Sequence, residues 1–397
     1  MSLPNEKTQV QEQEVISPKK ISYMQKSLQL LPGLMLCTII MILSSYFAKW
    51  FGTGINNYQG LPLNNPSAIS GIFVAVILGL FVRNIIGLQE VFKKGIMFSI
   101  NAMLKLGIIL LGIRLSFFDV IKLGAWGIPI IITCIASGLL ITLWITNKMN
   151  ESHRLGTLVA SGTAICGVTA IAAISPSIKA NDEELAYAIA NITLFGLITM
   201  LLYPYIAFYL FHADPIQAGL FLGTAIHDTA QVTGAALMYH QMFHIEEVIE
   251  TATITKLTRN VFIIAVVPIL TYLNRSKIVN EAEQVNPVKW YQLMPLFVIG
   301  FIALTIIRSI GDAGVAKDEL AFGLISSPQW TAIHHSLSTF GSYYLLGIGM
   351  AGVGLSTRLG IFKSLGIKPF YIGMVAALSV SIISLIMVYL ISGFITM

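Results

Sequence analysis

Charge is scarce in this sequence. Its 397 residues include 24 basic and 19 acidic side chains, so charged residues make up 11% of the chain, whereas soluble domains carry about 25%. Hydrophobic residues account for 55%, and the mean hydropathy is +0.78. This composition excludes a soluble fold. It predicts an all-α polytopic membrane protein in contact with the lipid bilayer, with a single transmembrane domain over residues 29–397.

Cysteine is equally scarce. The three cysteines, Cys37, Cys134 and Cys166, lie in apolar stretches without CxxC or Cys/His spacing, which excludes a disulfide framework and a zinc site. The sequence also lacks a Gly-rich phosphate loop and a Ser/His/Asp order. We therefore expect no enzyme activity, no cofactor and no bound metal. The basic residues lie in short loops rather than in one patch, so the pI near 9.0 does not indicate a nucleic-acid partner.

The polar segment 1–28 lacks the apolar core and the small-residue cleavage site of a signal peptide. We expect it to be a cytoplasmic leader. Apolar windows long enough to cross a bilayer follow it, and eleven are predicted, near residues 29–48, 67–83, 96–115, 124–146, 156–177, 186–211, 216–239, 250–273, 291–307, 339–355 and 369–392. The apolar stretch 319–333 contains two serines and a proline, so we expect it to be re-entrant or interfacial.

Basic residues indicate the orientation, because cytoplasmic loops hold the excess of Lys and Arg. With eleven spans and the N-terminus inside, the inner segments hold 15 basic residues and the outer segments hold six. This split predicts a multi-pass protein of the cell inner membrane with its N-terminus inside and its C-terminus outside.

A faint internal repeat is present. The run Gly112-Ile-Arg-Leu-Ser116 recurs as Gly352-Val-Gly-Leu-Ser356, and each copy precedes a Lys, a Gly and a long apolar stretch. The copies point in opposite directions in the eleven-span arrangement, as in inverted-repeat transporters. Chance similarity between Gly- and Leu-rich helix ends is the alternative.

Two segments contain polar groups unusual for a membrane span. The first contains Gly162, Thr163, Cys166, Gly167 and Thr169, and this pattern predicts a broken helix that faces a substrate, because paired glycines permit local unwinding. Tight helix packing is the alternative interpretation.

The second segment repeats the phrase Gly-Thr-Ala-Ile and continues with His227, Asp228 and Gln231. Asp228 is the only carboxylate that the span assignment places well inside the membrane, so it requires a partner or a wet cavity. An interfacial position is the alternative. His227 beside it predicts a pair that couples a proton to transport.

Basic side chains in neighbouring spans are the predicted partners of Asp228. Lys256 and Arg259 lie one helical turn apart in an apolar span, and Lys105 lies in another. The three cations and Asp228 together leave a surplus of positive charge. This surplus predicts an anion site in which Arg259 and Lys256 bind the anion. Snorkelling of Lys256 toward the interface is the alternative. The pairs His240/His244 and His334/His335 are interpreted as surface or interfacial residues.

These segments resemble the YeiH-like family of bacterial inner-membrane proteins, often labelled sulfate exporters. The resemblance begins near Gly71, runs to the C-terminus and rests on three motifs. These are Gly162-Thr-Ala-Ile-Cys-Gly167 with Ala170-Ile-Ala-Ala173, Ile226-His-Asp with Ala230-Gln-Val232, and Lys256-Leu-Thr-Arg259. The family usually shows Asn or Ala followed by Ser where this chain has Val168-Thr169, which keeps a hydroxyl but removes an amide.

The resemblance implies a multi-span secondary carrier. Together with the charge surplus, it predicts export of a small anion such as sulfate, sulfite or a sulfonate. The sequence is compatible with a homo-oligomer but does not decide the oligomeric state. A proton- or cation-coupled carboxylate carrier is the alternative within the same class. An intramembrane metalloenzyme using His227, Asp228, His240 and His244, or a membrane sensor, is the alternative from another class.

Overall fold

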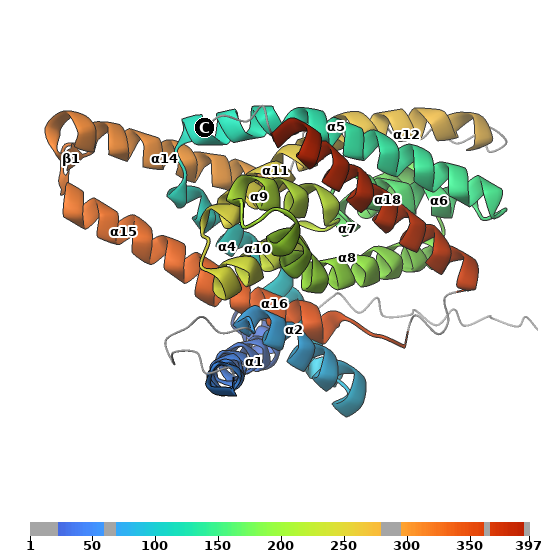
Figure 1. Ribbon diagram of the computed structural model, residues 1–397. Helices are drawn as coiled ribbons and strands as arrows, with labels where there is room; N and C mark the ends of the chain where they lie inside the picture. The colour runs from blue at the N-terminus through green and yellow to red at the C-terminus, as the bar shows by residue number, and fades with distance from the viewer. Residues whose placement is uncertain (1–22, 59–68, 279–294, 361–365, 393–397) are drawn as a thin grey trace, which may run out of the picture.

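The computed structural model describes residues 23–58, 69–278, 295–360 and 366–392 (Figure 1). The predicted leader therefore lies almost entirely outside the described residues. The first half of the described chain contains α1 (Tyr23–Tyr58), α2 (Gly71–Phe81), η1 (Val82–Ile86), α3 (Glu90–Phe98), η2 (Ser99–Met103), α4 (Leu104–Leu111), η3 (Gly112–Arg114), α5 (Phe117–Lys148), α6 (His153–Ala164), α7 (Val168–Ile174) and η4 (Ser175–Ile178). The second half contains α8 (Asp182–Leu210), α9 (Pro215–Ala225), α10 (Thr229–Phe243), α11 (Glu247–Val261), α12 (Ile263–Ile278), α14 (Leu296–Asp318), β1 (Leu320–Ala321), β2 (Ile325–Ser326), α15 (Ser327–Thr339), η5 (Phe340–Leu345), α16 (Leu346–Ser356) and α18 (Ile367–Ser392).

The predicted fold class is confirmed: the chain is an all-α polytopic membrane protein whose described residues include a single pair of two-residue strands. Seven helical stretches are long and apolar enough to cross a bilayer, namely Leu28–Tyr58, Glu90–Arg114, Val120–Lys148, Asp182–Leu210, Glu247–Asn274, Leu296–Asp318 and Ile367–Ile391. Two of the predicted spans, 156–177 and 216–239, are not single helices, because each is interrupted near its middle.

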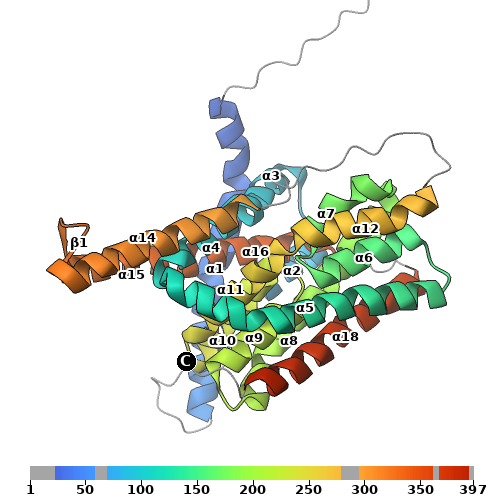
Figure 2. The ribbon, with the colours of Figure 1, turned by 90° about the horizontal axis from the view of Figure 1, so that it is seen from above.

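The first interrupted segment, α6 with α7, is a hairpin that returns to the side from which it entered. At its start, Ser152 donates a hydrogen bond to Glu184 at the start of α8. Ten residues further along α6 and eight residues further along α8, Gly162 lies against Ile192. The helices α6 and α8 therefore run parallel, which is possible only if α7 reverses the chain. Figure 2 shows α7 beside α12, and α7 contacts α12.

The second interrupted segment, α9 with α10, is also a hairpin. Gly219 lies against Thr251, and Gly223 lies against Thr255, so α9 and α11 run parallel with close backbone contact. The helix between them must reverse direction. Accordingly, α10 runs antiparallel to α11 and parallel to α8, where Phe208 stacks on Phe243 at a ring-centroid distance of 3.8 Å.

The eleven-span prediction is therefore wrong for these two segments. The physical reason is that a hairpin of two short apolar helices has the same length and hydropathy as one span. The other nine spans stay predicted crossings, and seven of them coincide with the long apolar helices named above. The first hairpin moves Lys179 to the side of the leader, so the split of basic residues becomes 16 to 5 and favours the same orientation of the termini. We call the side richer in basic residues the inner side.

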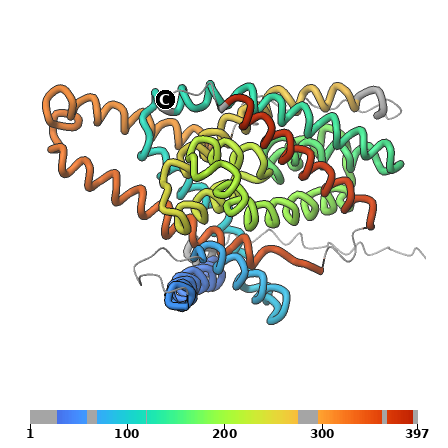
Figure 3. Tube along the Cα trace, viewed as in Figure 1, coloured from blue at the N-terminus to red at the C-terminus, as the bar shows by residue number. Residues whose placement is uncertain are grey.

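The segment 319–333 is not a re-entrant loop. Its first part forms the β1–β2 turn between α14 and α15, and its second part begins a helix that continues without a break through η5 and α16. A capping box between Ser326 and Gln329 starts this helix, with Pro328 in its first turn. Figures 1 and 3 show α14 and α15 projecting from the body and meeting at β1.

The repeat copies precede α5 and α18, and these two helices run in opposite directions. Antiparallel packing of α5 on α6 places Thr146 against Gly156 and Gly138 against Ala164. By contrast, α18 runs parallel to α8, since Asn191 bonds to Pro369 and Tyr203 bonds to Ser381. Opposite directions are what an inverted repeat requires.

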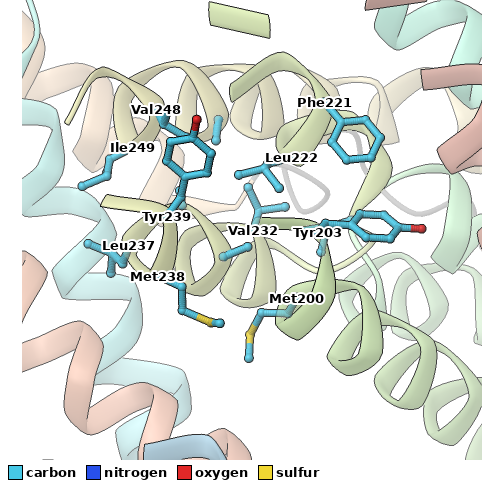
Figure 4. Packing of buried hydrophobic residues seen from close by; sticks show 14 of the residues in the cluster. Met200, Tyr203, Phe221, Leu222, Val232, Leu237, Met238, Tyr239, Val248 and Ile249 are labelled. Carbon is cyan, nitrogen blue, oxygen red and sulfur yellow. The ribbon is translucent and has the colours of Figure 1, made fainter. Parts of the chain in front are cut away.

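The apolar core surrounds the second hairpin. Figure 4 shows Met200 and Tyr203 of α8 packed with residues of α9, α10 and α11, including Phe221, Val232 and Tyr239. These side chains are 8% exposed or less. Because this core holds α10 between its neighbours, the start of α10 is fixed at the centre of the molecule.

Candidate functional site at the tips of the two hairpins

The tips of the two hairpins meet, and the repeated phrase Gly-Thr-Ala-Ile ends a helix in both. The helix α6 ends at Ala164, and α9 ends at Ala225. In each hairpin three residues then connect to the returning helix, which begins after Gly167 in the first hairpin and after Asp228 in the second. The backbone of Gly167 has a φ of +69°, a conformation that favours glycine.

Lys256 joins the two tips. Its ammonium group donates to the carbonyl oxygen of Ile165 at 3.0 Å and to that of Ile226 at 2.9 Å, and it also donates to the carbonyl of His227. Ile165 and Ile226 occupy equivalent positions in the repeated phrase. One cation therefore caps both tips at the same position, with all three of its donors engaged.

Arg259 repeats this arrangement one turn along α11. Its guanidinium donates to the carbonyl oxygen of Thr163 at 2.6 Å and to that of Thr224 at 2.5 Å, which are again equivalent positions. Its Nε donates to Ala164 at 2.8 Å. The guanidinium thus closes the last turn of both α6 and α9.

These bonds explain how two cations are tolerated here. The side chains of Lys256 and Arg259 are 0% exposed. The C-terminal end of a helix carries a partial negative charge of about half an electron and leaves carbonyl groups without intrahelical partners. Two such ends meet at Lys256 and Arg259, so backbone dipoles supply much of the countercharge that a buried cation requires.

Asp228 lies at the opposite pole of the same junction. Its carboxylate caps α10 by accepting from the N–H of Ala230 at 2.9 Å, and it lies near the N–H of Val168 at the start of α7. A Cβ atom on Gly167 would lie 2.8 Å from Oδ2 of Asp228. The carboxylate is therefore wedged between the N-terminal ends of both returning helices.

His227 is buried between these poles. Its ring is 0% exposed and lies close to the backbone of Thr163, but neither ring nitrogen makes a hydrogen bond of standard geometry within the described residues. The buried hydroxyl of Thr163 also lacks a hydrogen-bond partner among the described residues. Unsatisfied buried polar groups are uncommon and mark sites where water, an ion or a substrate supplies the missing partner.

An inner cavity of about 500 Å³ opens beside the tips. Five of the predicted site residues line it, namely Lys105, Cys166, Thr169, Asp228 and Gln231. The described lining includes none of the other six predicted site residues, which are Gly162, Thr163, Gly167, His227, Lys256 and Arg259. Gly162 packs against Ile171 within the first hairpin.

Several polar lining residues were not predicted from the sequence, and two of them affect the charge and hydrogen bonding of the cavity. Arg358 follows α16, and the prediction placed it in a loop, although it lines the inner cavity with Lys105. Asn260 directly follows Arg259, and its amide donates to the hydroxyl of Thr229 at 3.0 Å. The spacing of Lys256, Arg259 and Asn260 along one helix was a usable signal for Asn260, whereas Arg358 had none.

A larger cavity of about 750 Å³ lies at the other end of α10 and is called the outer cavity. Its lining includes His240 and Gln241 of α10, Glu246 and Glu250 near the start of α11, and residues of α1, α14 and α15. Leu237 also lines it, whereas Asp228 and Gln231 line the inner cavity. The helix α10 thus extends from one cavity to the other.

The four residues of the predicted metal site are not brought together. His227 and Asp228 precede α10, while His240 and His244 lie at its far end. Among the described residues, no group of three or more His, Cys, Asp or Glu side chains has an arrangement suited to a metal ion.

The fold and junction define a polytopic membrane protein with two opposed hairpins whose tips share two buried cations. The family described as "Conserved hypothetical protein 698" matches residues 32–373, and the chain belongs to this family. A UPF0324 membrane protein of Nitratidesulfovibrio vulgaris is 29% identical over 351 residues, which cover 86% of this chain and 88% of that protein. UPF0324 membrane proteins of Streptococcus pyogenes and Bacillus anthracis are 29% and 30% identical, over 92% and 90% of this chain and 98% and 94% of theirs.

Proposed function

We propose that this chain is a secondary carrier of a small anion, such as sulfate, sulfite or a sulfonate, in the inner membrane. The observation that carries the proposal is the junction of two opposed hairpins beside a cavity lined by cations. Opposed short helices whose ends meet at the centre of the membrane are a recurrent way to build a transport site.

The charge of the inner cavity favours an anion. Lys105 and Arg358 line it, and Asp228 is the acidic residue of its described lining. Lys256 and Arg259 add positive charge directly behind the tips. The forked guanidinium of Arg358 suits an oxyanion, and the ammonium of Lys105 adds a point charge.

This geometry changes the role that we assign to Lys256 and Arg259. The sequence suggested that they grip the substrate, but in this state their donors hold the carbonyl groups of the tips. We propose instead that they stabilise the junction and provide long-range attraction, while Lys105 and Arg358 meet the anion. Asp228 with His227 remains our proposed coupling pair.

Two cavities at opposite ends of α10 support alternating access. Between them, Met350 of α16 packs onto Gly234 of α10, where a Cβ atom would lie 2.6 Å from its terminal methyl. A small relative movement of α10 and α16 at this contact would connect the tips to one cavity or to the other.

The test combines binding with flux. Purified protein is screened by thermal shift against sulfate, sulfite, sulfonates and small carboxylates, and radiolabelled hits are followed in proteoliposomes. Lys105→Gln should reduce the stabilisation by the anion, whereas Lys317→Gln, which changes an exposed lysine on α14, is the matched control. Failure of every anion to stabilise the protein or to cross the membrane contradicts the proposal.

A carboxylate carrier coupled to protons or cations is the second candidate, because Asp228 and His227 lie next to the cavity. It differs in two outcomes: carboxylates would stabilise the protein more than sulfate, and uptake would follow an imposed proton or sodium gradient. Metal analysis of the purified protein tests the metalloenzyme alternative, and absence of flux with retained ligand binding would favour a sensor.

A further inference from the structure

The outer cavity contains a concentration of ionisable side chains that the proposed transport site does not use. Three basic residues line it, Lys49 of α1, Arg114 at the end of η3 and Arg308 of α14. Three histidines line it as well, His240 of α10 with His334 and His335 of α15. These residues come from five separate elements that converge on one space.

The permanent charges of this cavity give it no surplus of positive charge. Arg114 forms ion pairs with Glu246 and Glu250, and both glutamates also line the cavity. Arg308 is paired with Asp312 at 2.6 Å, and Asp312 also accepts a hydrogen bond from Trp330. With Lys49, three cations stand against Glu246, Glu250 and the Asp312 that pairs with Arg308, and Glu247 beside His240 adds a fourth carboxylate. A surplus of positive charge in this cavity therefore depends on the histidines.

The histidines face these charges directly. His334 packs edge-on against Trp330 beside Arg308 and Asp312, with His335 next to it. His240 faces Arg114, His244 and Glu247, and its buried Nδ1 lacks a hydrogen-bond partner among the described residues. Both His240 and His334 lie outside the seven long apolar helices. Burial, followed by the neighbouring arginine, lowers the pKa of each imidazole.

We propose that the outer cavity is a second anion-binding site whose affinity is set by protonation of His240 and His334. At neutral pH these two imidazoles are uncharged and the cavity carries no surplus of positive charge. Acidification on the outer side adds positive charge at both histidines, and a small oxyanion then binds to it. The proposal rests on the proposed function only for the class of ligand, a small anion.

The sign of the pH dependence follows from histidine chemistry. Histidine ordinarily titrates near pH 6.5, and the lowered pKa of His240 and His334 moves their protonation to more acidic solutions. Anion binding in this cavity should therefore be weak at pH 7.5 and should strengthen as the pH falls toward 5.0. A carrier with such a site would collect anions from an acidic outer compartment or would be inhibited by them there.

The test measures the electrostatic potential of the outer cavity through the reaction rates of charged thiol reagents. Ser342→Cys introduces a thiol into its lining, while the native cysteines are all buried. The full-length protein reacts with two methanethiosulfonates of similar size, one carrying a sulfonate and one a trimethylammonium group. The rate with the sulfonate reagent is divided by the rate with the trimethylammonium reagent, which cancels the pH dependence of the thiol itself. This ratio should rise about fivefold or more between pH 7.5 and pH 5.0.

The histidine variants decide the assignment. His334→Gln with His335→Gln changes two residues that are not buried, so it should keep the fold and reduce the rise, and adding His240→Gln should abolish it. His153→Gln, outside this cavity, is the control. A ratio that stays flat in the parent protein, or that still rises in the triple variant, overturns the proposal.

Binding is tested with inorganic sulfate. Sulfate should protect the Ser342→Cys thiol at pH 5.0 and not at pH 7.5, compared with chloride at equal ionic strength. Absence of protection at both values overturns the assignment as a binding site. Lys105→Gln, in the inner cavity, should leave the rate ratio and the protection unchanged, so failure of the outer site and failure of the proposed transport site give different results.

Discussion

Ile165 and Ile226 present their backbone carbonyl oxygens to the same ammonium group, that of Lys256, at 3.0 and 2.9 Å. The two residues are 61 positions apart and hold the same place in two copies of one phrase. Two half-membrane hairpins from opposite sides are thereby tied together by one side chain. The stability of the junction and its capacity to move depend on this contact.

Replacement of Lys256 by methionine should destabilise the junction strongly. Lys256→Met keeps most of the side-chain volume but leaves three carbonyl groups without a donor, at about 1 to 3 kcal/mol for each buried group left unsatisfied. We expect a large fall in the thermal midpoint measured in detergent. Lys317→Gln, on an exposed part of α14, should leave the midpoint unchanged. A stable Lys256→Met protein would show that the ammonium group does not hold the tips.

Gly167 offers a test of the tip backbone. Gly167→Ala places a methyl group 2.8 Å from Oδ2 of Asp228 at a φ of +69°, a conformation that costs a non-glycine residue about 1 to 3 kcal/mol. Gly87→Ala has a φ of +87° with open space around it, so it measures the backbone cost alone. Gly54→Ala, in α1 with no atom within 4 Å, is the neutral control. Gly167→Ala should lower the thermal midpoint most; equal effects at Gly167 and Gly87 would mean that the contact with Asp228 is unimportant.

The hairpins make a topological prediction that differs from the eleven-span arrangement at two loops. With hairpins, Ala180 lies on the inner side and Ala213 on the outer side, whereas eleven spans place them the other way round. Cysteines introduced singly at these positions should be labelled by an impermeant maleimide from the inner side and from the outer side respectively. Labelling of Ala180→Cys in intact cells would restore the first segment as a full span.

How much the sequence could reveal is clear at this junction. Hydropathy predicted the helical class and the repeated phrase marked both breaks, because glycine and small residues are needed where helices end and approach closely. Reversal of the chain was not predictable, since contacts such as Gly219 with Thr251 leave no trace in hydropathy. The buried cations were recognised, but their partners were not, because every residue carries a carbonyl group.

The cavity itself depends on residues that only the fold brings together. Lys105 and Arg358 are separated by more than half of the chain, and both line the inner cavity. Asp228 was predicted to need a cation as its partner; Lys256 does attract its carboxylate electrostatically, but the hydrogen bond of this carboxylate is to the backbone of α10. Capping of a helix N-terminus satisfies a carboxylate as well as an ion pair does, and sequence spacing does not distinguish the two.

The opposing charges of the inner cavity give the last prediction. Asp228→Asn should preserve the cap of α10, because asparagine and aspartate cap helices almost equally well, and the thermal midpoint should stay close to that of the parent protein. Loss of the negative charge beside Lys105 and Arg358 should tighten sulfate binding about three- to tenfold, and Lys105→Gln should weaken it by a similar factor. Titration calorimetry on protein in nanodiscs of neutral lipid measures both affinities at pH 7.5, where the lowered pKa of His240 and His334 keeps these two residues uncharged. Because a coupling carboxylate must also change its charge during the cycle, Asp228→Asn should bind sulfate tightly while its flux in proteoliposomes falls. Shifts of the two affinities in the same direction would show that the bound anion does not respond to the charges of this cavity, and the anion site would then have to lie elsewhere.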